Sequence, residues 1–292
     1  MNDNDWHKLQ EDLIKSKYHY FHTDRGVLLC GNCLDVLRVL PNESIDLIFT
    51  SPPYFVRKDY EAKEKTPEAY QTYLNLLLNT FSLSERILVN GGNLYIDIDD
   101  SHTSLKSVFK KSIVLPTHAH LIVNLSQIFD YKEMILWKKI RGKHATGGAK
   151  RLLGSYGRFR SPACIPIVQE CEYILWFRKR GKRRDVTDEL RKASALTPEE
   201  FKEFGMQIWE IQPERIRTFG HPTPFPITLA NRIIKIGSFV HDVVLDMFCG
   251  SGTTPLACEQ LNRKWIAIDI NRDYCDITKK RVLEYVKQRR LC

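Results

Sequence analysis

Short runs of β-branched and aliphatic residues recur along the chain and predict the strands of a sheet. They lie at residues 27–30, 45–50, 94–98, 121–124, 134–137, 173–177, 243–247 and 265–270. Several of these runs are almost continuously apolar, which is typical of strands buried on both faces of a parallel sheet. We therefore expect a sheet that is covered by other elements on both sides.

Helical segments alternate with these runs. The clearest one begins with Thr66 as its N-cap and Pro67 in its first turn, and it ends at the Asn-Gly-Gly of residues 90–92. Its apolar positions recur at helical spacing: Tyr70, Tyr73, Leu74, Leu77 and Phe81. A second Thr-Pro-Glu sequence predicts another helix start at residues 197–199. Strands that alternate with helices predict an α/β fold with a doubly wound, mostly parallel sheet.

The charge is unevenly distributed along the chain. The 292 residues carry 44 Lys and Arg against 35 Asp and Glu, a formal net charge of +9. Residues 132–192 contain 17 of these basic residues and 6 of the acidic ones, so this segment carries +11 and the remainder −2. Its stretches 141–160 and 178–195 also interrupt the alternation of strands and helices, and we interpret them as basic insertions on the α/β body.

Basic residues gathered within reach of one another are typical of a face that binds a polyanion. A solvated, lysine-rich loop is the simpler alternative. Two details favour nucleic acid: the densest part is mostly Arg, whose guanidinium suits phosphates and guanine edges, and aromatic residues interleave with Arg at residues 154–160. The residues predicted to contact DNA are Lys138, Lys139, Arg141, Lys143, Arg151, Arg158, Arg160, Arg178, Lys179, Arg180, Arg183 and Arg184.

Composition narrows the class of protein. Hydrophobic residues make up 43% of the chain and charged residues 27%, which is typical of globular proteins and excludes disordered and fibrous chains. No apolar run approaches the ~18 residues of a membrane span, and the polar start of the chain has no secretory apolar segment. We therefore expect a cytoplasmic protein whose eight cysteines are reduced thiols.

One predicted strand ends in an unusual loop, with the sequence Asp-Leu-Ile-Phe-Thr-Ser-Pro-Pro-Tyr at residues 46–54. Because proline has no N–H, the chain leaves the sheet with unpaired carbonyl groups. At the carboxyl end of a parallel strand, such a loop presents the Ser51 hydroxyl, the carbonyl oxygens and the Tyr54 ring to a crevice. These groups suit a planar ligand that carries an amino group, whereas an ordinary rigid strand exit is the simpler alternative.

A second strand runs into a glycine-containing loop, with the sequence Val-Leu-Asp-Met-Phe-Cys-Gly-Ser-Gly-Thr-Thr at residues 244–254 and a predicted helix at 255–261. Gly250 and Gly252 allow a ligand to approach the backbone, and the helix start offers amide groups. The spacing is neither that of a Walker loop nor that of the GxGxxG dinucleotide fingerprint. Asp269, near the end of the next strand, is placed to accept hydrogen bonds from ribose hydroxyls or to cap a helix.

Four ordered motifs together resemble the S-adenosylmethionine-dependent amino methyltransferases of DNA. They are TSPPY at residues 50–54, EYILWF at 172–177, HPTPFP at 221–226 and DMFCGSGTT at 246–254. The resemblance extends from about residue 26 to about residue 285. Because the catalytic motif precedes the cofactor loop with a basic region between them, the order resembles the β class of this family. It implies a Rossmann-like class I methyltransferase fold with circularly permuted motif order and a basic insertion for DNA recognition.

The resemblance also implies a role for each motif. Ser51 and the carbonyl group of Pro52 would accept the two N–H hydrogens of the target amine, and Tyr54 would stack on a base flipped out of the duplex. The implied catalytic residues are Ser51, Pro52, Pro53 and Tyr54. The implied cofactor-binding residues are Asn32, Thr50, His221, Pro224, Phe225, Asp246, Phe248, Gly250, Ser251, Gly252, Thr253 and Asp269. Asn32 stands where the family more often has aspartate and Asp269 where it more often has glutamate.

Serine before the two prolines resembles the family members that methylate cytosine N4, whereas adenine-N6 members more often have aspartate or asparagine there. We therefore predict a site-specific cytosine-N4 DNA methyltransferase. Its expected cofactor is S-adenosylmethionine, its expected partner is double-stranded DNA, and a cognate restriction endonuclease would act on the same site. The alternatives are an adenine-N6 enzyme, a catalytically silent DNA-binding relative, and an RNA or protein substrate.

The motif order divides the chain into three predicted parts. Residues 1–140 form the catalytic half of the methyltransferase domain and residues 206–292 the cofactor-binding half. Residues 141–205 form the basic insertion and target recognition region, with a core strand near residues 171–178. The Cys-x-x-Cys of residues 30–33 has no second Cys or His pair at zinc spacing, so no metal is expected. The recognition sequence and the choice between monomer and homodimer have no readable pattern.

Overall fold

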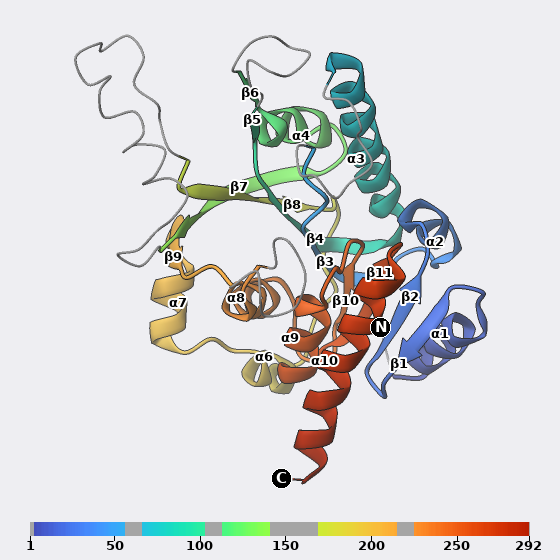
Figure 1. Ribbon diagram of the computed structural model, residues 1–292. Coiled ribbons are helices and arrows are strands. Elements are labelled where there is room, and N and C mark those ends of the chain that lie inside the picture. The colour runs from blue at the N-terminus through green and yellow to red at the C-terminus, as the bar shows by residue number, and fades with distance from the viewer. Residues whose placement is uncertain (1–2, 56–65, 103–112, 141–168, 215–224, 292) are drawn as a thin grey trace.

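Nine strands of the described chain form one mixed sheet, in the order β1-β2-β11-β10-β3-β4-β8-β7-β9 (Figure 1). The computed structural model describes residues 3–55, 66–102, 113–140, 169–214 and 225–291. The strands of the sheet are β1 His19–His22, β2 Gly26–Cys30, β3 Ile45–Thr50, β4 Leu88–Ile98, β7 Asp130–Lys139, β8 Cys171–Arg178, β9 Ile208–Ile211, β10 Val243–Asp246 and β11 Lys264–Asp269. The short strands β5 Ser101–His102 and β6 Val114–Leu115 pair separately.

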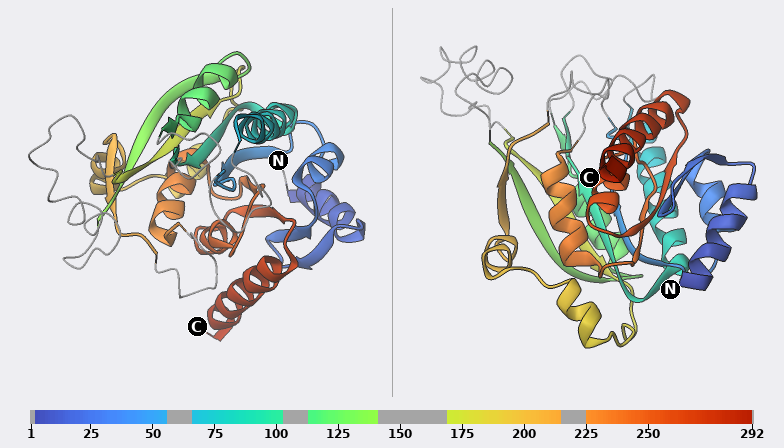
Figure 2. Two further views of the ribbon diagram at one scale, coloured as in Figure 1. Left: turned by 45° about the horizontal axis from the view of Figure 1, so that its top comes forward. Right: turned by 90° about the horizontal axis from the view of Figure 1, so that it is seen from below.

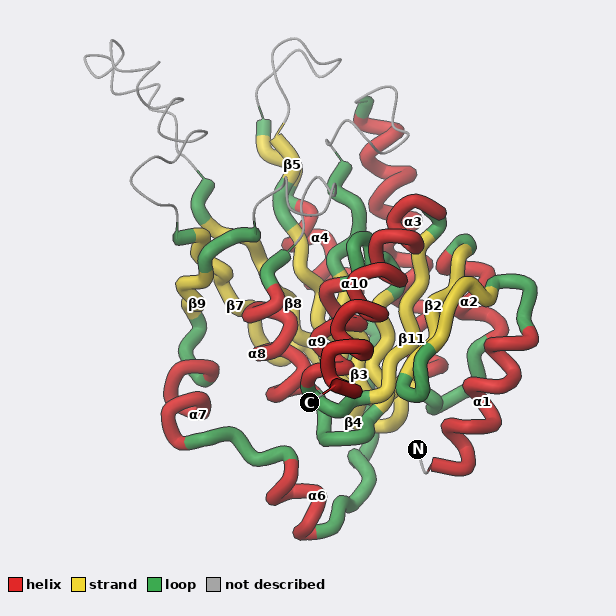
Figure 3. Tube along the Cα trace, turned by 60° about the horizontal axis from the view of Figure 1, so that its bottom comes forward, coloured by secondary structure: helices red, strands yellow, loops and turns green. Residues whose placement is uncertain are grey.

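Five neighbouring strands of this sheet, β2, β11, β10, β3 and β4, run parallel. β8 is antiparallel to both β4 and β7, and β1 is antiparallel to β2. The carboxyl ends of the five parallel strands therefore meet at one edge, which we call the carboxyl edge, and their starts define the amino edge. In Figure 3, β5 marks the carboxyl edge and α6, Asp188–Ala193, lies at the amino edge.

Helices cover both faces of the sheet (Figure 2). One face packs against α1 Asp3–Lys15, α2 Cys33–Val39, α3 Pro67–Ile87 and α4 Thr117–Leu125, and the other against α8 Ile227–Gly237, α9 Thr253–Gln260 and α10 Arg272–Leu291. Each face has its own apolar core, because alternate residues of the buried strands point to opposite sides. The short helix α7, Pro198–Phe204, lies beside β9. The predicted doubly wound α/β fold is confirmed.

All predicted strand runs except one lie in strands of the sheet. The run at residues 121–124 is instead part of α4, so that prediction is wrong. Leu121 and Leu125 are both fully buried, and they are four residues apart, which places them on one face of a helix against the sheet. The β-branched residues between them produced the apparent strand pattern, and the tertiary contacts of the two leucines outweigh that local preference.

The two predicted helix starts are present. The Thr66 hydroxyl accepts a hydrogen bond from the Ala69 amide at 3.0 Å, and Thr197 and Glu200 form a reciprocal capping box at the start of α7. The first helix ends at Ile87, before the predicted stop at residues 90–92, and those residues belong to β4. None of the described helices is long and apolar enough to cross a membrane.

Candidate active site

The TSPPY and DMFCGSGTT motifs both begin at the carboxyl edge of the sheet. Thr50 is the last residue of β3, Asp246 the last of β10 and Asp269 the last of β11, and these three strands are neighbours. The Gly31 amide, directly after β2, donates to the Asp269 carbonyl oxygen at 2.9 Å. The glycine-containing loop and the Ser-Pro-Pro-Tyr loop therefore begin at one edge, where open α/β sheets have their ligand sites.

Asp246 holds the base of the glycine-containing loop. Its buried carboxylate accepts hydrogen bonds from the hydroxyls of Thr50 and Thr254, both at 2.6 Å, and from the Phe248 amide at 3.1 Å. Burial raises the pKa of Asp246 to about 6, and the two hydroxyl hydrogen bonds oppose this shift. Asp246 thus links the end of β3 to the loop after β10, and its carboxylate is occupied by protein donors.

The loop is supported from behind by α10, which the sequence did not indicate. Gly250 and Gly252 have φ values of +50° and +79°, and a Cβ atom on Gly252 would lie 2.6 Å from the Thr278 side chain. The Thr278 hydroxyl donates to the Gly250 carbonyl oxygen at 2.9 Å. Arg281 donates to the Ser251 carbonyl oxygen and to the hydroxyls of Ser251 and Thr253. Glycine is needed at residue 252 both for its backbone conformation and for this close packing.

Asp269 closes the other side of the loop. One carboxylate oxygen accepts from the Gly250 amide and the other from the Asn271 amide, each at 2.8 Å. Burial raises the pKa of Asp269, while these backbone hydrogen bonds oppose the shift. The next residue, Ile270, has 72% of its surface exposed, so an apolar side chain stands beside an acceptor at the strand end. Sequence analysis did not single out Ile270.

The remaining predicted cofactor residues lie outside the glycine-containing loop and the end of β11. The side-chain oxygen of Asn32 accepts from the Leu34 amide at 2.9 Å and caps α2, so it serves the helix start beside Asp269. Phe225 is buried, and its ring lies 5.1 Å from that of Phe49, in the core beneath α8. His221 and Pro224 lie outside the described residues.

The catalytic loop begins directly after Thr50. Ser51 is half-buried, and its hydroxyl lies 3.5 Å from the hydroxyl of Tyr54, whose side chain is buried. Burial, followed by the negative charges of Asp97 and Glu172, raises the pKa of the Tyr54 hydroxyl well above its usual range. Tyr54 is therefore a neutral hydroxyl beside Ser51, and the carboxyl groups of Asp97 and Glu172 lie near it.

The predicted DNA-binding residues fall into three groups. Lys138 and Lys139 lie at the end of β7, where Lys138 pairs with Glu210 and Lys139 with Glu172. A second group lies outside the described residues: Arg141, Lys143, Arg151, Arg158 and Arg160. The third group follows β8 and comprises Arg178, Lys179, Arg180, Arg183 and Arg184.

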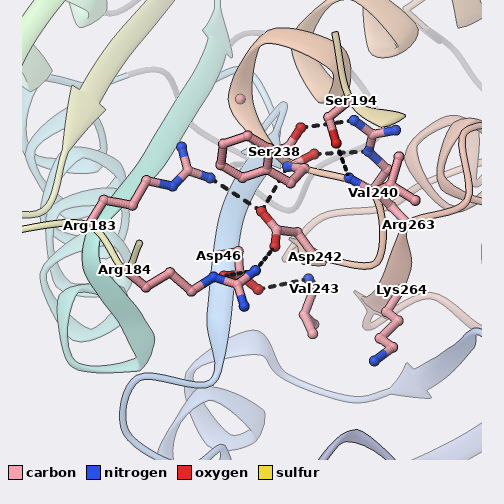
Figure 4. Close-up of polar contacts among 12 residues, drawn as sticks. Asp46, Arg183, Arg184, Ser194, Ser238, Val240, Asp242, Val243, Arg263 and Lys264 are labelled. Atoms are coloured by element: carbon pink, nitrogen blue, oxygen red, sulfur yellow. Dashed lines mark hydrogen bonds and ion pairs between the residues drawn. The ribbon is translucent and has the colours of Figure 1, made fainter. Parts of the chain in front are cut away.

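The third group lies at the amino edge, whereas Ser51 lies at the carboxyl edge. β8 runs antiparallel to β4, and Arg178 pairs with Asn93, so the chain after β8 emerges at the starts of the parallel strands. Arg183 and Arg184 form ion pairs with buried Asp242, and Arg184 also lies 3.8 Å from Asp46 (Figure 4).

The other three basic residues of the third group also have intramolecular partners. Arg178 donates to the Gly91 carbonyl oxygen, Arg180 pairs with Asp130, and the buried Lys179 ammonium donates to the Leu88 carbonyl oxygen. The structure therefore corrects the expectation of one basic face. Among the described residues, Lys138 and Lys139 lie at the carboxyl edge, whereas the group after β8 lies at the amino edge and binds acidic and carbonyl groups of the chain itself.

The described residues contain no group of three or more His, Cys, Asp or Glu side chains that could hold a metal ion. The two cysteines of the Cys-x-x-Cys lie at the end of β2 and in the first turn of α2.

Solved structures with this fold include two DNA methylases. TTHA0409 from Thermus thermophilus, solved in complex with S-adenosyl-L-methionine, is 32% identical, with a TM-score of 0.73 over 89% of this chain and 93% of that one. The cytosine-N4-specific PvuII DNA methyltransferase has a TM-score of 0.66 at 19% identity, over 91% of this chain and 89% of that one, and this likeness concerns the fold alone. Fold and site together define a Rossmann-like protein of the methyltransferase class.

Sequence comparison gives the family. A family model described as DNA methylase, covering N6 and N4 methyltransferases, matches residues 45–280. Type II methyltransferase M.MjaI of Methanocaldococcus jannaschii is 32% identical over 286 residues, which cover 86% of this chain and 89% of that protein. The chain belongs to this N6/N4 family of DNA methyltransferases.

Proposed function

We propose that this protein is a site-specific DNA methyltransferase that transfers a methyl group from S-adenosylmethionine to the exocyclic N4 amine of cytosine. One observation carries the proposal. Ser51 directly follows Thr50, whose hydroxyl is hydrogen-bonded to Asp246 at the base of the glycine-containing loop. The residue that would hold the target amine is thereby tied to the loop that would hold the methyl donor.

The residues of the carboxyl edge fit this cofactor. Gly250 and Gly252 lack side chains where a ligand must approach the backbone. Asp269 presents a carboxylate at the strand end, which suits ribose hydroxyls, and exposed Ile270 offers an apolar surface to an adenine ring. When bound, S-adenosylmethionine supplies an electrophilic methyl group on its sulfonium.

The chain itself contributes positioning and hydrogen bonding. An exocyclic amine is a weak nucleophile because its lone pair is delocalised into the ring. The Ser51 hydroxyl and the Pro52 carbonyl oxygen would accept its N–H hydrogens and favour a tetrahedral nitrogen whose lone pair is free to attack. The neutral Tyr54 side chain would pack against the flipped base. Lys138, the more exposed of the two lysines at the end of β7, lies at the same edge as these residues, where phosphate groups of a duplex would arrive.

Two further features support DNA and cytosine as the substrate. M.MjaI is a type II methyltransferase, which supports a restriction-modification setting with an endonuclease that acts on the same site. Serine at residue 51 supports cytosine N4 over adenine N6, because the resemblance assigns serine mainly to the cytosine-N4 members.

A direct experiment tests the reaction and the base together. The protein is incubated with S-adenosylmethionine and unmethylated duplex DNA of mixed sequence, and the DNA is digested to nucleosides for mass spectrometry. We expect N4-methylcytosine from the wild-type protein and none from a Ser51→Ala control. Formation of N6-methyladenine alone would overturn the assignment to cytosine. Absence of both products would overturn the proposed reaction.

A further inference from the structure

A charged cluster lies beside the catalytic loop at the carboxyl edge. It consists of Asp97 near the end of β4, Glu172 on β8 and Lys139 at the end of β7. Because β8 lies between β4 and β7, the three side chains come together across adjacent strands. Glu172 accepts a hydrogen bond from the Lys139 ammonium, and both side chains are largely buried. Asp97 belongs to none of the sequence motifs.

Asp97 is the member whose charge is least compensated. Its side chain is 1% exposed, and within the described part of the chain its Oδ1 atom has no hydrogen-bond partner. Asp97 follows Ile96, which pairs with Thr50 across the parallel strands β4 and β3, so Asp97 and Ser51 are neighbours at the carboxyl edge. A buried carboxylate that lacks partners for one oxygen is costly, so such a group tends to take up a proton.

The charges around Asp97 explain how strongly it binds a proton. With both carboxylates ionised and Lys139 charged, the cluster carries a net charge of −1, and one added proton neutralises it. Burial, followed by repulsion from Glu172, raises the pKa of Asp97 well above its usual range; Lys139 lowers it and Asp99 raises it further. The neutral Tyr54 hydroxyl also faces Asp97. The buried cluster therefore has high affinity for a single proton.

Methylation of an amine releases a proton. The new N–CH₃ bond forms as the S–CH₃ bond of the sulfonium breaks, and the nitrogen becomes neutral –NH–CH₃ only when one N–H proton leaves. A serine hydroxyl can accept that proton while its own proton passes to a neighbouring carboxylate. Ser51 is placed for such a transfer because the register of β3 and β4 sets it beside Asp97.

We propose that Asp97 is the final acceptor of the proton that the target amine loses, that the proton reaches it through the Ser51 hydroxyl, and that Glu172 and Lys139 set its proton affinity. The inference rests on the proposed function, since it concerns the proton released by methyl transfer. After the transfer the cluster is neutral, and the proton returns to solvent during product release.

The test compares Asp97→Asn with the wild-type protein in single-turnover methylation of duplex DNA, measured from pH 5.5 to pH 9. The amide can still accept a hydrogen bond from Ser51, but it cannot take a proton. We expect the rate to fall by about 100-fold or more, a typical contribution of general-base catalysis. The wild-type rate should decline at low pH as Asp97 becomes protonated, and the variant should lack this acid limb. A rate within threefold of wild type, with the same acid limb, overturns the proposal.

Glu172→Gln provides a second measurement, the pH at which the methylation rate declines. A purely structural role of Glu172 would leave this pH unchanged. Removing the negative charge beside Asp97 lowers its pKa, so the acid limb should shift to lower pH while methylation persists. An unshifted limb contradicts the role of Glu172. Should Asp97→Asn fail to bind S-adenosylmethionine, which would indicate misfolding, the pH shift of Glu172→Gln decides the question alone.

Asp46→Asn is the matched control, because it neutralises a buried carboxyl at the amino edge of the same sheet. Its acid limb should coincide with that of the wild type. A shift as large as that of Glu172→Gln would show that the limb reports the stability of the sheet and would overturn the proposal. Failure of the proposed function itself looks different, because the wild-type protein would then form no methylated nucleoside at all.

Discussion

Both edges of the sheet bury carboxylates, but the groups that compensate the buried charge differ between the edges. At the amino edge, Asp242 is paired with two arginines and also accepts from the Phe239 amide at 2.8 Å. At the carboxyl edge, Asp246 is held by hydroxyl and backbone donors, and Asp97 leaves one oxygen without a hydrogen-bond partner in the described structure. Burial raises the pKa of Asp242, Asp246 and Asp97 alike, and two arginines oppose that shift only for Asp242.

This difference separates what stabilises the fold from what the site requires. A guanidinium fixed against a carboxylate partly compensates its desolvation and lowers its affinity for a proton. Hydroxyl and amide donors compensate a carboxylate less completely, so its pKa remains sensitive to a ligand or to a neighbouring charge. We therefore expect substitutions at the amino edge to act on stability and substitutions at the carboxyl edge to act on binding, rate and pH dependence.

The largest effect is expected for Ser51→Ala at the carboxyl edge. Loss of the hydroxyl removes an acceptor for the target amine and the link to Asp97, so the single-turnover methylation rate should fall by about 10²- to 10⁴-fold. Affinity for S-adenosylmethionine, measured by calorimetry, should change less than about twofold. An equal loss of both would mean that Ser51 supports the cofactor loop, and the separation between binding and chemistry would be lost.

The next largest effect compares two buried carboxyls. Asp242→Asn leaves Arg183 and Arg184 without their carboxylate, and it should lower the free energy of unfolding by about 2 kcal/mol in urea titrations. The expected loss is moderate because the Arg184 side chain is 38% exposed and solvent screens its charge. Asp97→Asn should lower the free energy of unfolding by less than about 1 kcal/mol, because this substitution leaves no arginine without its carboxylate partner. Similar losses in both variants would contradict the contrast between the edges.

A smaller effect is expected at the end of β11. Asp269→Asn keeps an oxygen for a backbone amide but removes the charge that ribose hydroxyls would meet, so the Kd for S-adenosylmethionine should rise about tenfold, or about 1.4 kcal/mol. Asp273→Asn, an exposed carboxylate in the first turn of α10, is the matched control and should leave the Kd unchanged. If both variants weaken binding equally, the effect is one of general electrostatics.

The sequence predicts the local parts of the site well, for a physical reason. A proline pair after a buried strand and a glycine-containing loop before a helix determine backbone conformation within a few residues. TSPPY and DMFCGSGTT could therefore be placed at strand ends before the fold was known. Their proximity in space followed from the α/β alternation, because parallel strands end at one edge.

The parts that sequence analysis missed depend on register and strand direction. Arg183 and Arg184 belong to a basic run, but only the antiparallel course of β8 carries them to the amino edge and to Asp242. In the sequence, Asp97 is a single acidic residue in an apolar strand. Its proton affinity depends on Glu172, which strand pairing brings close to it. Thr278 and Arg281, which support the glycine-containing loop, lie about 30 residues further along the chain.

The smallest effect concerns the pH dependence of stability and Asp246. Its pKa is raised to about 6 in the folded protein, mainly by burial, so the folded state binds its proton more tightly than the unfolded state does. Lowering the pH from 7 to 5 should therefore stabilise the fold through this group by about 1 kcal/mol. In Asp246→Asn the free energy of unfolding should lack this increment, measured as the difference between the two pH values rather than as the absolute stability. An increment that persists in the variant would place the titrating group elsewhere. An increment that also disappears in Asp242→Asn would show that arginine pairing does not distinguish the two edges.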